Sequence, residues 1–340
     1  MAQRIIADYH THSLASDGNW RPSKVVTEAK KRGLESIALT DHDTTHGIPE
    51  ALQEGNRVGL KVVSGIEIDS SFNSGDLVLD SIEILGLGFD LLLLESFTEQ
   101  LAAQRLRLYT DIAARFNQYI SSDEFKQHNP NSKYPLINLS SIGAHDMVLW
   151  KCRWNGYFNP SPVFSNTEIL FYIFDRFAPK VNLIGRTLQG DKNTLWEVMR
   201  EYNFLFDVQK DKPFSAQAIK EIKDAGGLAI LAHPGLSALY LDGMLTPEWN
   251  QEEEQWFKGH NQSSPFAFIR SLKQAGLDGV ELYFYRGNDK VHGHLQGRIN
   301  MYFGLLSRQL GLGVTLGSDC HGPRGREPYL GLFGSDKIII

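Results

Sequence analysis

Apolar positions in the first third of the chain alternate between two periodicities. Runs rich in Ile and Val, over residues 4–10, 36–43 and 61–69, have the short apolar pattern of buried β-strands. Between them, residues 22–33 and 48–59 have the spacing of amphipathic helices. This βαβα alternation predicts strands that pair in parallel, with the helices outside them.

The pattern changes after a further expected strand over residues 80–90. From about residue 96 to 205 the periodicity is mostly helical, and it begins with an amphipathic helix predicted over 98–120. The polar stretch 121–135 is typical of a loop.

Alternation of helix and strand resumes in the last third of the chain. Helices are expected over 215–227, 266–276 and 288–311, and the strands that follow them over 228–235, 279–284 and 313–322. The acidic segment around residues 247–256 is expected to be a solvated loop. We therefore predict one α/β barrel domain from residues 1–95 and 206–340, with a helical insertion subdomain at 96–205.

Composition places the chain among ordinary globular proteins. Of 340 residues, 42% are hydrophobic and 22% charged, and the formal net charge is −6. That balance does not indicate a polyanion-binding protein, although bound cations are absent from the count. Two cysteines cannot form a disulfide framework. With no apolar run long enough for a signal peptide or a membrane span, the sequence predicts a cytoplasmic protein.

Polar residues with metal-binding side chains gather where the predicted strands end. They are His10 and His12, Asp17 shortly after them, His42, Glu67, His233, Asp319 and His321. In a barrel of parallel strands the C-terminal strand ends meet at one face, where active sites are built. Histidine is only 11 of 340 residues, so an even scatter would not place it at most of these ends.

The spacing of two in His10-x-His12 and Asp319-x-His321 puts both side chains of each pair on one face of a strand. Cys320 then points the other way, so we expect it to be packed rather than ligating. Imidazole and carboxylate together suit zinc, manganese or iron.

A lone buried histidine is usually a hydrogen-bonded core residue and not a metal ligand. Taken alone, His42 or His233 would therefore be weak evidence for a metal site. The prediction depends on the whole set of residues lying together at the strand ends. The remaining histidines are expected at the surface or behind the ligands; apart from one in the insertion, they are His46, His128, His260, His292 and His294.

The ordered motifs HTH, SDG, LTDHDTTHG, GIE, LAHPG and GSDCHG resemble those of the polymerase and histidinol phosphatase (PHP) superfamily. The resemblance runs from about residue 4 to 331 and is strongest to the bacterial branch of nucleotide phosphatases and 5′→3′ exoribonucleases. It implies a distorted (β/α)7 barrel with the metal site at the C-terminal ends of the strands.

The resemblance also implies two to three divalent metal ions (Mn, Zn or Fe). One would be held by His10, His12, Glu67 and Asp319. A second would share Glu67 and take His233 with a histidine of the insertion. A third would take Asp17, His42 and His321.

The insertion histidine is assigned to His145, because it follows Ile-Gly at an expected helix start, and His128 is a weaker alternative. The family's Arg and Pro are missing beside it. Glu83 stands where relatives often carry histidine, and we expect it to support the ligands or the fold. Arg324 and Arg326 follow the last motif and are candidates for contacts to a substrate phosphate, although an exposed arginine is more often solvated.

The implied activity is hydrolysis of phosphate monoesters of small phosphorylated metabolites by attack of a metal-bridging hydroxide. His233 or Asp319 would protonate the leaving group or shuttle the proton, and the sequence leaves both open. The expected substrate is a nucleoside 3′,5′-bisphosphate or the 5′ end of a short RNA, with histidinol phosphate as an alternative.

Two other functions are compatible with part of this pattern. A metal-dependent amidohydrolase also begins with His-x-His, but Asp17 and the closing Asp319-x-His321 favour the phosphoesterase. A metal-binding domain without catalysis would typically have lost ligands, whereas here a full set can be assigned. No membrane or protein partner is indicated by the sequence.

Overall fold

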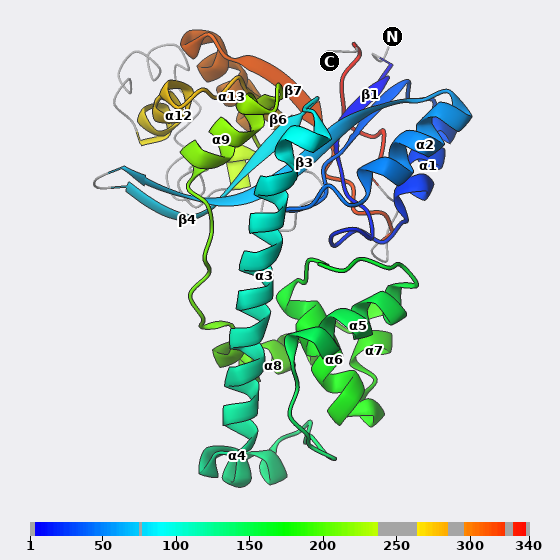
Figure 1. The fold of residues 1–340 in the computed structure, drawn as a ribbon, viewed down its shortest axis with the longest axis vertical. Helices are drawn as coiled ribbons and strands as arrows, with labels where there is room; N and C mark the ends of the chain where they lie inside the picture. The colour runs from blue at the N-terminus through cyan, green and yellow to red at the C-terminus, as the bar shows by residue number, and fades with distance from the viewer. Residues whose placement is uncertain (1–3, 75–76, 237–263, 285–295, 324–328, 338–340) are drawn as a thin grey trace.

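The strands of the computed structural model form a single seven-stranded sheet that curls into a barrel (Figure 1). The structure describes residues 4–74, 77–236, 264–284, 296–323 and 329–337. The strands are β1 (Ala7–Thr11), β2 (Ser36–Leu39), β3 (Lys61–Ser74), β4 (Leu77–Leu87), β5 (Leu228–Leu231), β6 (Gly279–Tyr283) and β7 (Gly313–Gly317). They are hydrogen-bonded in sequence order from β1 to β7.

Four of the strand pairings are parallel, as the alternation predicts, but β4 runs antiparallel to both of its neighbours. The prediction of parallel pairing throughout was therefore wrong for this strand. Only two residues separate Ser74 from Leu77. A parallel partner needs a crossover of a dozen residues or more, so β3 and β4 can pair only as a hairpin.

Main-chain contacts between β1 and the end of β7 close the barrel. Thr11 forms a parallel bridge with Cys320, and the His12 N–H donates to the Cys320 carbonyl at 2.9 Å. The distorted β/α barrel expected from the sequence is thus confirmed.

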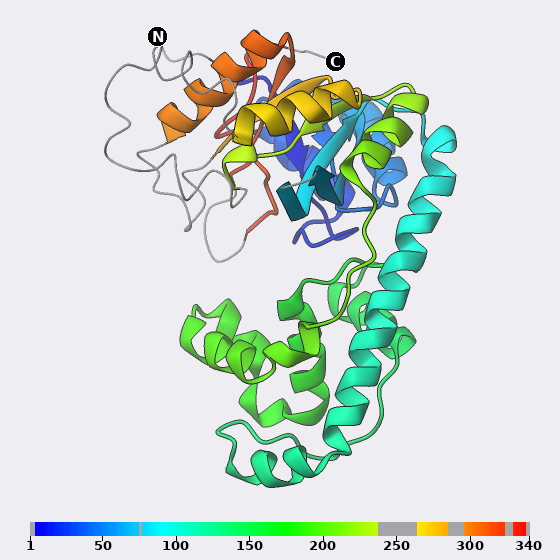
Figure 2. The ribbon, with the colours of Figure 1, turned by 90° about the vertical axis from the view of Figure 1, so that its left-hand side faces the viewer.

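Helices outside the barrel cover the sheet (Figures 1 and 2). They are α1 (Pro22–Lys31), α2 (Ile48–Val58), α9 (Ser215–Asp224), α12 (Ser264–Gln274) and α13 (Gln296–Leu310). Helix α1 begins at Pro22, where a missing N–H costs nothing, and Gly33 follows its end with φ 82°.

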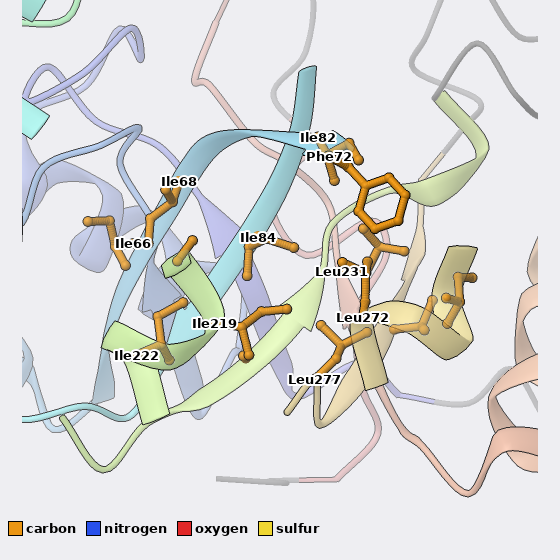
Figure 3. Packing of buried hydrophobic residues seen from close by; sticks show 14 of the residues in the cluster. Ile66, Ile68, Phe72, Ile82, Ile84, Ile219, Ile222, Leu231, Leu272 and Leu277 are labelled. Atoms are coloured by element: carbon orange, nitrogen blue, oxygen red, sulfur yellow. The ribbon is translucent and has the colours of Figure 1, made fainter. Parts of the chain in front are cut away.

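The largest apolar core lies between the sheet and these helices. Ile219 and Ile222 of α9 pack with Ile66 of β3 and Ile84 of β4, all fully buried (Figure 3). A separate cluster consists of barrel residues alone and fills the interior, with Tyr9 as its bulkiest member. These two layers fix the strands whose ends carry the polar residues.

The residues between β4 and α9 form a helical unit that lies to one side of the barrel (Figure 2). Its helices are α3 (Leu91–Ile120), α4 (Asp123–His128), α5 (Ala144–Asn155), α6 (Asn166–Phe177), α7 (Leu183–Leu188) and α8 (Lys192–Glu201), with short 3-10 turns at η1 (Asn129–Asn131), η2 (Pro179–Val181) and η3 (Asn203–Phe206). A fourth 3-10 turn, η4 (Pro234–Leu236), follows β5 in the barrel. An aromatic-rich core of its own holds this unit together.

Helix α3 joins the two units. It starts earlier than the predicted 98–120, because the Asp90 side chain caps it by accepting from the Leu92 N–H at 2.8 Å. Leu94 packs in the barrel core and Phe116 in the second core. The division at residue 96 remains a prediction, and this helix crosses it.

Residues 121–135 are not all loop, which corrects the expectation. Ser122 caps α4 by accepting from the Phe125 N–H, and acidic residues occupy its first turn. The acidic segment 247–256, and the part of the predicted helix 288–311 before Gln296, lie outside the described residues. Within the described chain, no helix is both long and apolar enough to cross a membrane.

Candidate metal centre

The two histidines of β1 lie side by side at the C-terminal end of the barrel. His10 and His12 are fully buried, and their Nε2 atoms are 3.0 Å apart. Both rings lie on one side of the strand end, as the spacing of two predicts. Cys320 is buried among apolar residues of α1 and α2, as expected, and burial raises the pKa of its thiol to about 11.

Glu67 lies at the middle of the cluster. Its Oε2 atom is 3.1 Å from His10 Nε2 and 3.2 Å from both His12 Nε2 and His42 Nδ1. The position is inside β3 rather than at its end, because β3 continues to Ser74 as an arm of the hairpin. A parallel bridge between Glu67 and His42 fixes the two side chains relative to each other.

The chain after β7 brings in Asp319 and His321. Asp319 Oδ1 is 3.0 Å from His12 Nε2 and 3.5 Å from His10 Nε2. His321 stacks on His12 with ring centroids 4.2 Å apart, and its Nε2 is 3.1 Å from Asp17 Oδ1. Asp319 has φ 52°, a left-handed backbone conformation that is rare outside glycine and frequent at functional sites.

His233 completes the cluster from the end of β5. Its Nε2 is 3.0 Å from Glu67 Oε1 and 3.2 Å from Glu83 Oε2. The His233 N–H donates to Glu281 Oε2 at 2.8 Å. His233 also has a positive φ, of 20°, so two residues of the cluster are held in sparsely populated backbone conformations.

Asp17 is carried by the loop that follows β1, residues 13–18. Asp41 shapes this loop by accepting from the Ser13 N–H at 2.7 Å and from the Ser13 and Ser16 hydroxyls at 2.7 and 2.6 Å. At Gly18 a Cβ would lie 2.7 Å from main-chain atoms of the same loop, so only glycine permits the turn. The loop directs Asp17 toward His42 and His321.

Among the described residues, three sets of nitrogen and oxygen atoms lie close enough to share a metal ion, with all donor atoms of each set within 4.8 Å of one another. The sets are His10, His12, Glu67 and Asp319; His12, Asp17, His42 and His321; and His42, Glu67 and Glu83. We refer to the first as the strand group and to the second as the loop group.

The donor atoms fit a divalent cation better than they fit each other. Glu67 Oε2 is buried near three imidazole nitrogens, yet it has no contact of hydrogen-bond geometry within the part of the chain that the structure describes. Asp319 Oδ1 likewise lies near imidazole nitrogens without such a contact among those residues. Buried carboxylate oxygens are nearly always hydrogen-bonded, so such oxygens among imidazoles indicate a metal site. Mixed imidazole and carboxylate donors suit zinc, manganese or iron.

The charges of the cluster shift one another strongly. Burial would lower the pKa of His12, but the Asp319 and Glu67 carboxylates outweigh it and raise the pKa to about 10. For His233, burial is outweighed by Glu83 and Glu67, and the pKa rises to about 9. Although burial opposes it, the neighbouring histidines hold the pKa of Glu67 well below its usual range.

Two acidic residues belong to this centre although the sequence analysis missed one and undervalued the other. Glu281 is buried and accepts from His10 Nδ1 at 2.9 Å, which fixes the orientation of that ring. Glu281 is a carboxylate within the otherwise apolar strand GVELY, and this pattern could have marked it as a candidate site residue. Glu83 faces the cluster directly, and burial followed by the Glu67 charge raises its pKa to about 7.

Other predicted residues are not brought into the cluster. His145 is exposed in the first turn of α5, and the donor sets found among the described residues do not include it. Its role as a ligand therefore stays a prediction. Arg324 and Arg326 lie outside the described residues. His128 is exposed and pairs with Glu201 in the insertion.

Aspartates beside the ligands hold backbone rather than imidazoles. Asp8 accepts from the Ser318 N–H and hydroxyl at 2.9 and 2.5 Å, and Asp43 accepts from the Asp69 N–H at 3.0 Å. These contacts fix the turns that present the ligands.

Comparison with known proteins gives a consistent picture. The model of the PHP domain matches residues 8–149. The chain is 33% identical over 243 residues to the 5′-3′ exoribonuclease Rnm of Escherichia coli, covering 70% of this chain and 69% of the relative. It is 25% identical over 328 residues to the phosphoribosyl 1,2-cyclic phosphate 1,2-diphosphodiesterase of Eggerthella lenta, covering 96% of this chain and 98% of the relative.

A solved structure agrees on the fold. A crystal structure of a metal-dependent phosphoesterase from Bifidobacterium adolescentis superposes with a TM-score of 0.62. It is 23% identical, and the match covers 99% of this chain and 94% of that one.

Proposed function

Because the chain belongs to the PHP family of metal-dependent phosphoesterases, we propose that it hydrolyses a phosphate ester of a small ribose-containing metabolite. The first candidates are a nucleoside 3′,5′-bisphosphate and the 5′ end of a short RNA. The observation that carries the proposal is the convergence of His10, His12, Glu67 and Asp319 on one point at the barrel end.

Each part of the cluster has a role in this chemistry. Divalent ions bound there would lower the pKa of water and offset the charge of the phosphate oxygens. Glu67 has one oxygen toward His10 and the other toward His233, so it would contribute a ligand oxygen on both sides of the cluster. Glu281 and the bridge from Glu67 to His42 keep the donors oriented before substrate arrives.

The leaving oxygen needs a proton, and His233 and Asp319 are the two candidates for its source. In the metal-free protein, the surrounding histidines hold the pKa of Asp319 well below its usual range despite its burial. His233 has a raised pKa and packs edge-on against Tyr283. Ligation and proton donation exclude each other at His233 Nε2, so His233→Ala distinguishes them. If His233 is the proton donor, the variant keeps its metal content and loses rate. If His233 is a ligand, the variant loses metal.

A second candidate substrate is a phosphoribosyl cyclic phosphate. It is favoured by the Eggerthella lenta relative, whose name specifies that substrate and which is matched over 98% of its length. The two candidates differ in the bond that breaks, since the cyclic ester opens to a monoester without releasing phosphate.

The deciding experiment offers both substrates to the purified protein with added Mn²⁺. Phosphate release is followed with adenosine 3′,5′-bisphosphate and p-nitrophenyl phosphate, release of phosphate or mononucleotide with a 5′-phosphorylated oligoribonucleotide, and ring opening with phosphoribosyl 1,2-cyclic phosphate. Chelator-treated protein and Asp319→Ala are the controls. Metal-dependent turnover of the bisphosphate or RNA end supports the first proposal, and ring opening alone supports the second. A metal-loaded protein inert toward all four would contradict both and leave a binding role.

A further inference from the structure

The helical insertion contacts the barrel at the loops that carry the loop group. The contacts come from α5 and from residues 156–164, which we call the docking segment. We propose that Lys151 and Asn159 are positioning residues that hold the loop carrying Asp17, so that the insertion sets the metal affinity of the loop group. The inference rests on the proposed function only in requiring that the cluster binds metal.

Lys151 is a buried cation that reaches out of the insertion into the barrel. Its side chain is 1% exposed, and its ammonium donates to the Ser16 carbonyl at 3.0 Å and to the Val163 carbonyl of the docking segment. Ser16 immediately precedes Asp17. A hydrogen bond from a buried charge to that carbonyl fixes the backbone from which the Asp17 side chain projects.

Glu168 compensates the charge of Lys151. Its Oε1 lies 2.8 Å from Lys151 Nζ, and its Oε2 accepts from the Ser165 N–H at the start of α6. An unpaired buried ammonium would cost several kcal/mol, so the pair commits α6 to the same position as α5.

Asn159 makes the second contact to the same loop. It is 2% exposed, and its side-chain amide donates to the Ala15 carbonyl at 2.8 Å. Its own side-chain oxygen accepts from the Ser161 N–H at 2.9 Å, which orients the amide. Two consecutive carbonyls, at Ala15 and Ser16, are therefore held by the insertion just before Asp17.

The docking segment also reaches the loop that carries His42. Arg105 of α3 donates to the Asp43 carbonyl at 2.8 Å and to the Ser161 hydroxyl at 3.1 Å, joining that loop to the docking segment. His46 Nε2 lies 3.1 Å from the Phe158 carbonyl. Both loops that supply Asp17 and His42 are thus held from outside the barrel.

The strand group is supported differently. Glu67 lies within the hydrogen-bonded ladder of β3, and His10 within β1, where Glu281 of β6 fixes its ring. The two groups share His12 but differ in what positions their other members. Loosening the insertion should therefore weaken the loop group and leave the strand group loaded.

The test removes Lys151 without leaving an unpaired charge. The variant K151M/E168Q takes away both members of the ion pair, and glutamine at 168 still serves the capping box of α6. The matched control is Lys133→Met, an exposed insertion lysine paired with Glu197. Metal content after dialysis and metal affinity by calorimetry are measured for each protein, with unfolding followed by circular dichroism.

We expect K151M/E168Q to bind the metal of the loop group about 10- to 100-fold more weakly, as is typical when support behind a ligand is lost. Asp17→Asn should remove the same metal. Combining D17N with K151M/E168Q should cause no further loss, because both act on one site. Lys133→Met should match the wild type.

An unchanged affinity in K151M/E168Q, or a loss that adds to that of D17N, would overturn the inference, since a merely structural role predicts additivity. If K151M/E168Q does not fold, Asn159→Ala, which removes one hydrogen bond to the same loop, decides by the same measurements. A wild type that binds metal but turns over no phosphoester would contradict the proposed function and leave this inference intact.

Discussion

The orientation of the His10 imidazole in the metal centre depends on an acceptor behind it. Glu281 has two tasks, since Oε1 faces His10 Nδ1 and Oε2 accepts from the His233 N–H. A carboxylate can satisfy both partners because both of its oxygens are acceptors. An amide has only one acceptor, so it cannot replace the carboxylate here.

Glu281→Gln should therefore weaken metal binding or slow turnover by about 10- to 100-fold while the barrel stays folded. The amide nitrogen would face either the His10 ring or the His233 N–H, and one of these contacts is lost. Metal titration and steady-state rates check the effect, with the exposed Glu35→Gln as control. Full metal affinity together with a wild-type rate would show that His10 needs no such support.

The raised pKa values of the histidines predict that metal and protons compete. Without metal, His12 has a pKa of about 10 and His233 of about 9, against 6.5 for a free histidine. Both are protonated near neutral pH, whereas a metal needs the neutral ring, so binding must release protons. Calorimetric titration near pH 7 in buffers of different ionisation enthalpy measures this release. A heat that does not depend on the buffer would contradict it.

The same shifts fix the pH dependence of stability in the metal-free protein. A histidine whose pKa is raised on folding contributes stability below its unfolded value of 6.5, and loses it as pH rises through the folded value. For His233 and His12 that loss falls between 6.5 and about 10. Metal binding should become tighter over the same interval, because fewer protons remain to be displaced.

At the scale of elements, close packing of β7 against β1 leaves no space for a side chain at Gly317. A Cβ there would overlap the His10 Cβ and the Glu281 carboxylate. Neither neighbour can move freely, because His10 is on the adjacent strand and Glu281 is bonded to two partners. Glycine is therefore required at this position by the packing of the metal centre.

Gly317→Ala should destabilise the fold by about 1–3 kcal/mol and lower metal affinity, because it displaces His10. Gly304 in α13 is the matched control: a Cβ there meets nothing within 4 Å. Gly304→Ala should stabilise the helix by about 0.5–1 kcal/mol. Chemical denaturation and metal titration of both variants provide the measurement, and equal behaviour of the two would contradict the packing argument.

Periodicity predicts elements well where strand and helix alternate, and it fails where a strand turns back on its neighbour. Helices α1 and α2 follow from their apolar spacing and their proline and glycine signals. The direction of β4 does not follow from its own residues, since an apolar strand can pair either way. The two-residue gap after Ser74 is the deciding feature, and it lies in the connection rather than in the strand.

Site residues are likewise predictable from the sequence only where local pattern alone places them. Residues that end strands, such as His10 and Asp319, are recognisable because polar side chains interrupt apolar runs. Glu83 comes from the strand whose direction was mispredicted, and its approach to Glu67 depends on the hairpin register that pairs Asp69 with Glu83. The role of Lys151 is harder still to predict from the sequence, because its contact with Ser16 joins residues 135 positions apart.

At the scale of the whole molecule, the protein has two apolar cores joined by helix α3. One lies between the sheet and its outer helices, and the other is confined to the insertion. The metal centre belongs to the barrel, but the contacts from Lys151 and Asn159 connect it to the second core. Stability of the two cores should therefore respond unequally to metal.

Removal of metal should lower the stability of the barrel more than that of the insertion. A ligand that binds only the folded state stabilises it by RT ln(1 + [L]/Kd), about 2.7 kcal/mol when metal is at 100 times its Kd. Without metal, the charged Glu67 and Asp319 carboxylates and the partly ionised Glu83, whose pKa is about 7, face one another at the barrel end, and protons on the histidines offset this charge. Hydrogen exchange with and without chelator resolves this effect, because it reports each element separately.

We expect chelation to speed exchange most in β1, β3 and the loop that carries Asp17. Amides in the core of α6, which has seven buried residues and a complete capping box, should change least. Magnesium-free buffer without chelator is the control for ionic effects. Uniform loss of protection in both cores would mean that the molecule opens as one cooperative unit, and that the insertion depends on metal as strongly as the barrel does.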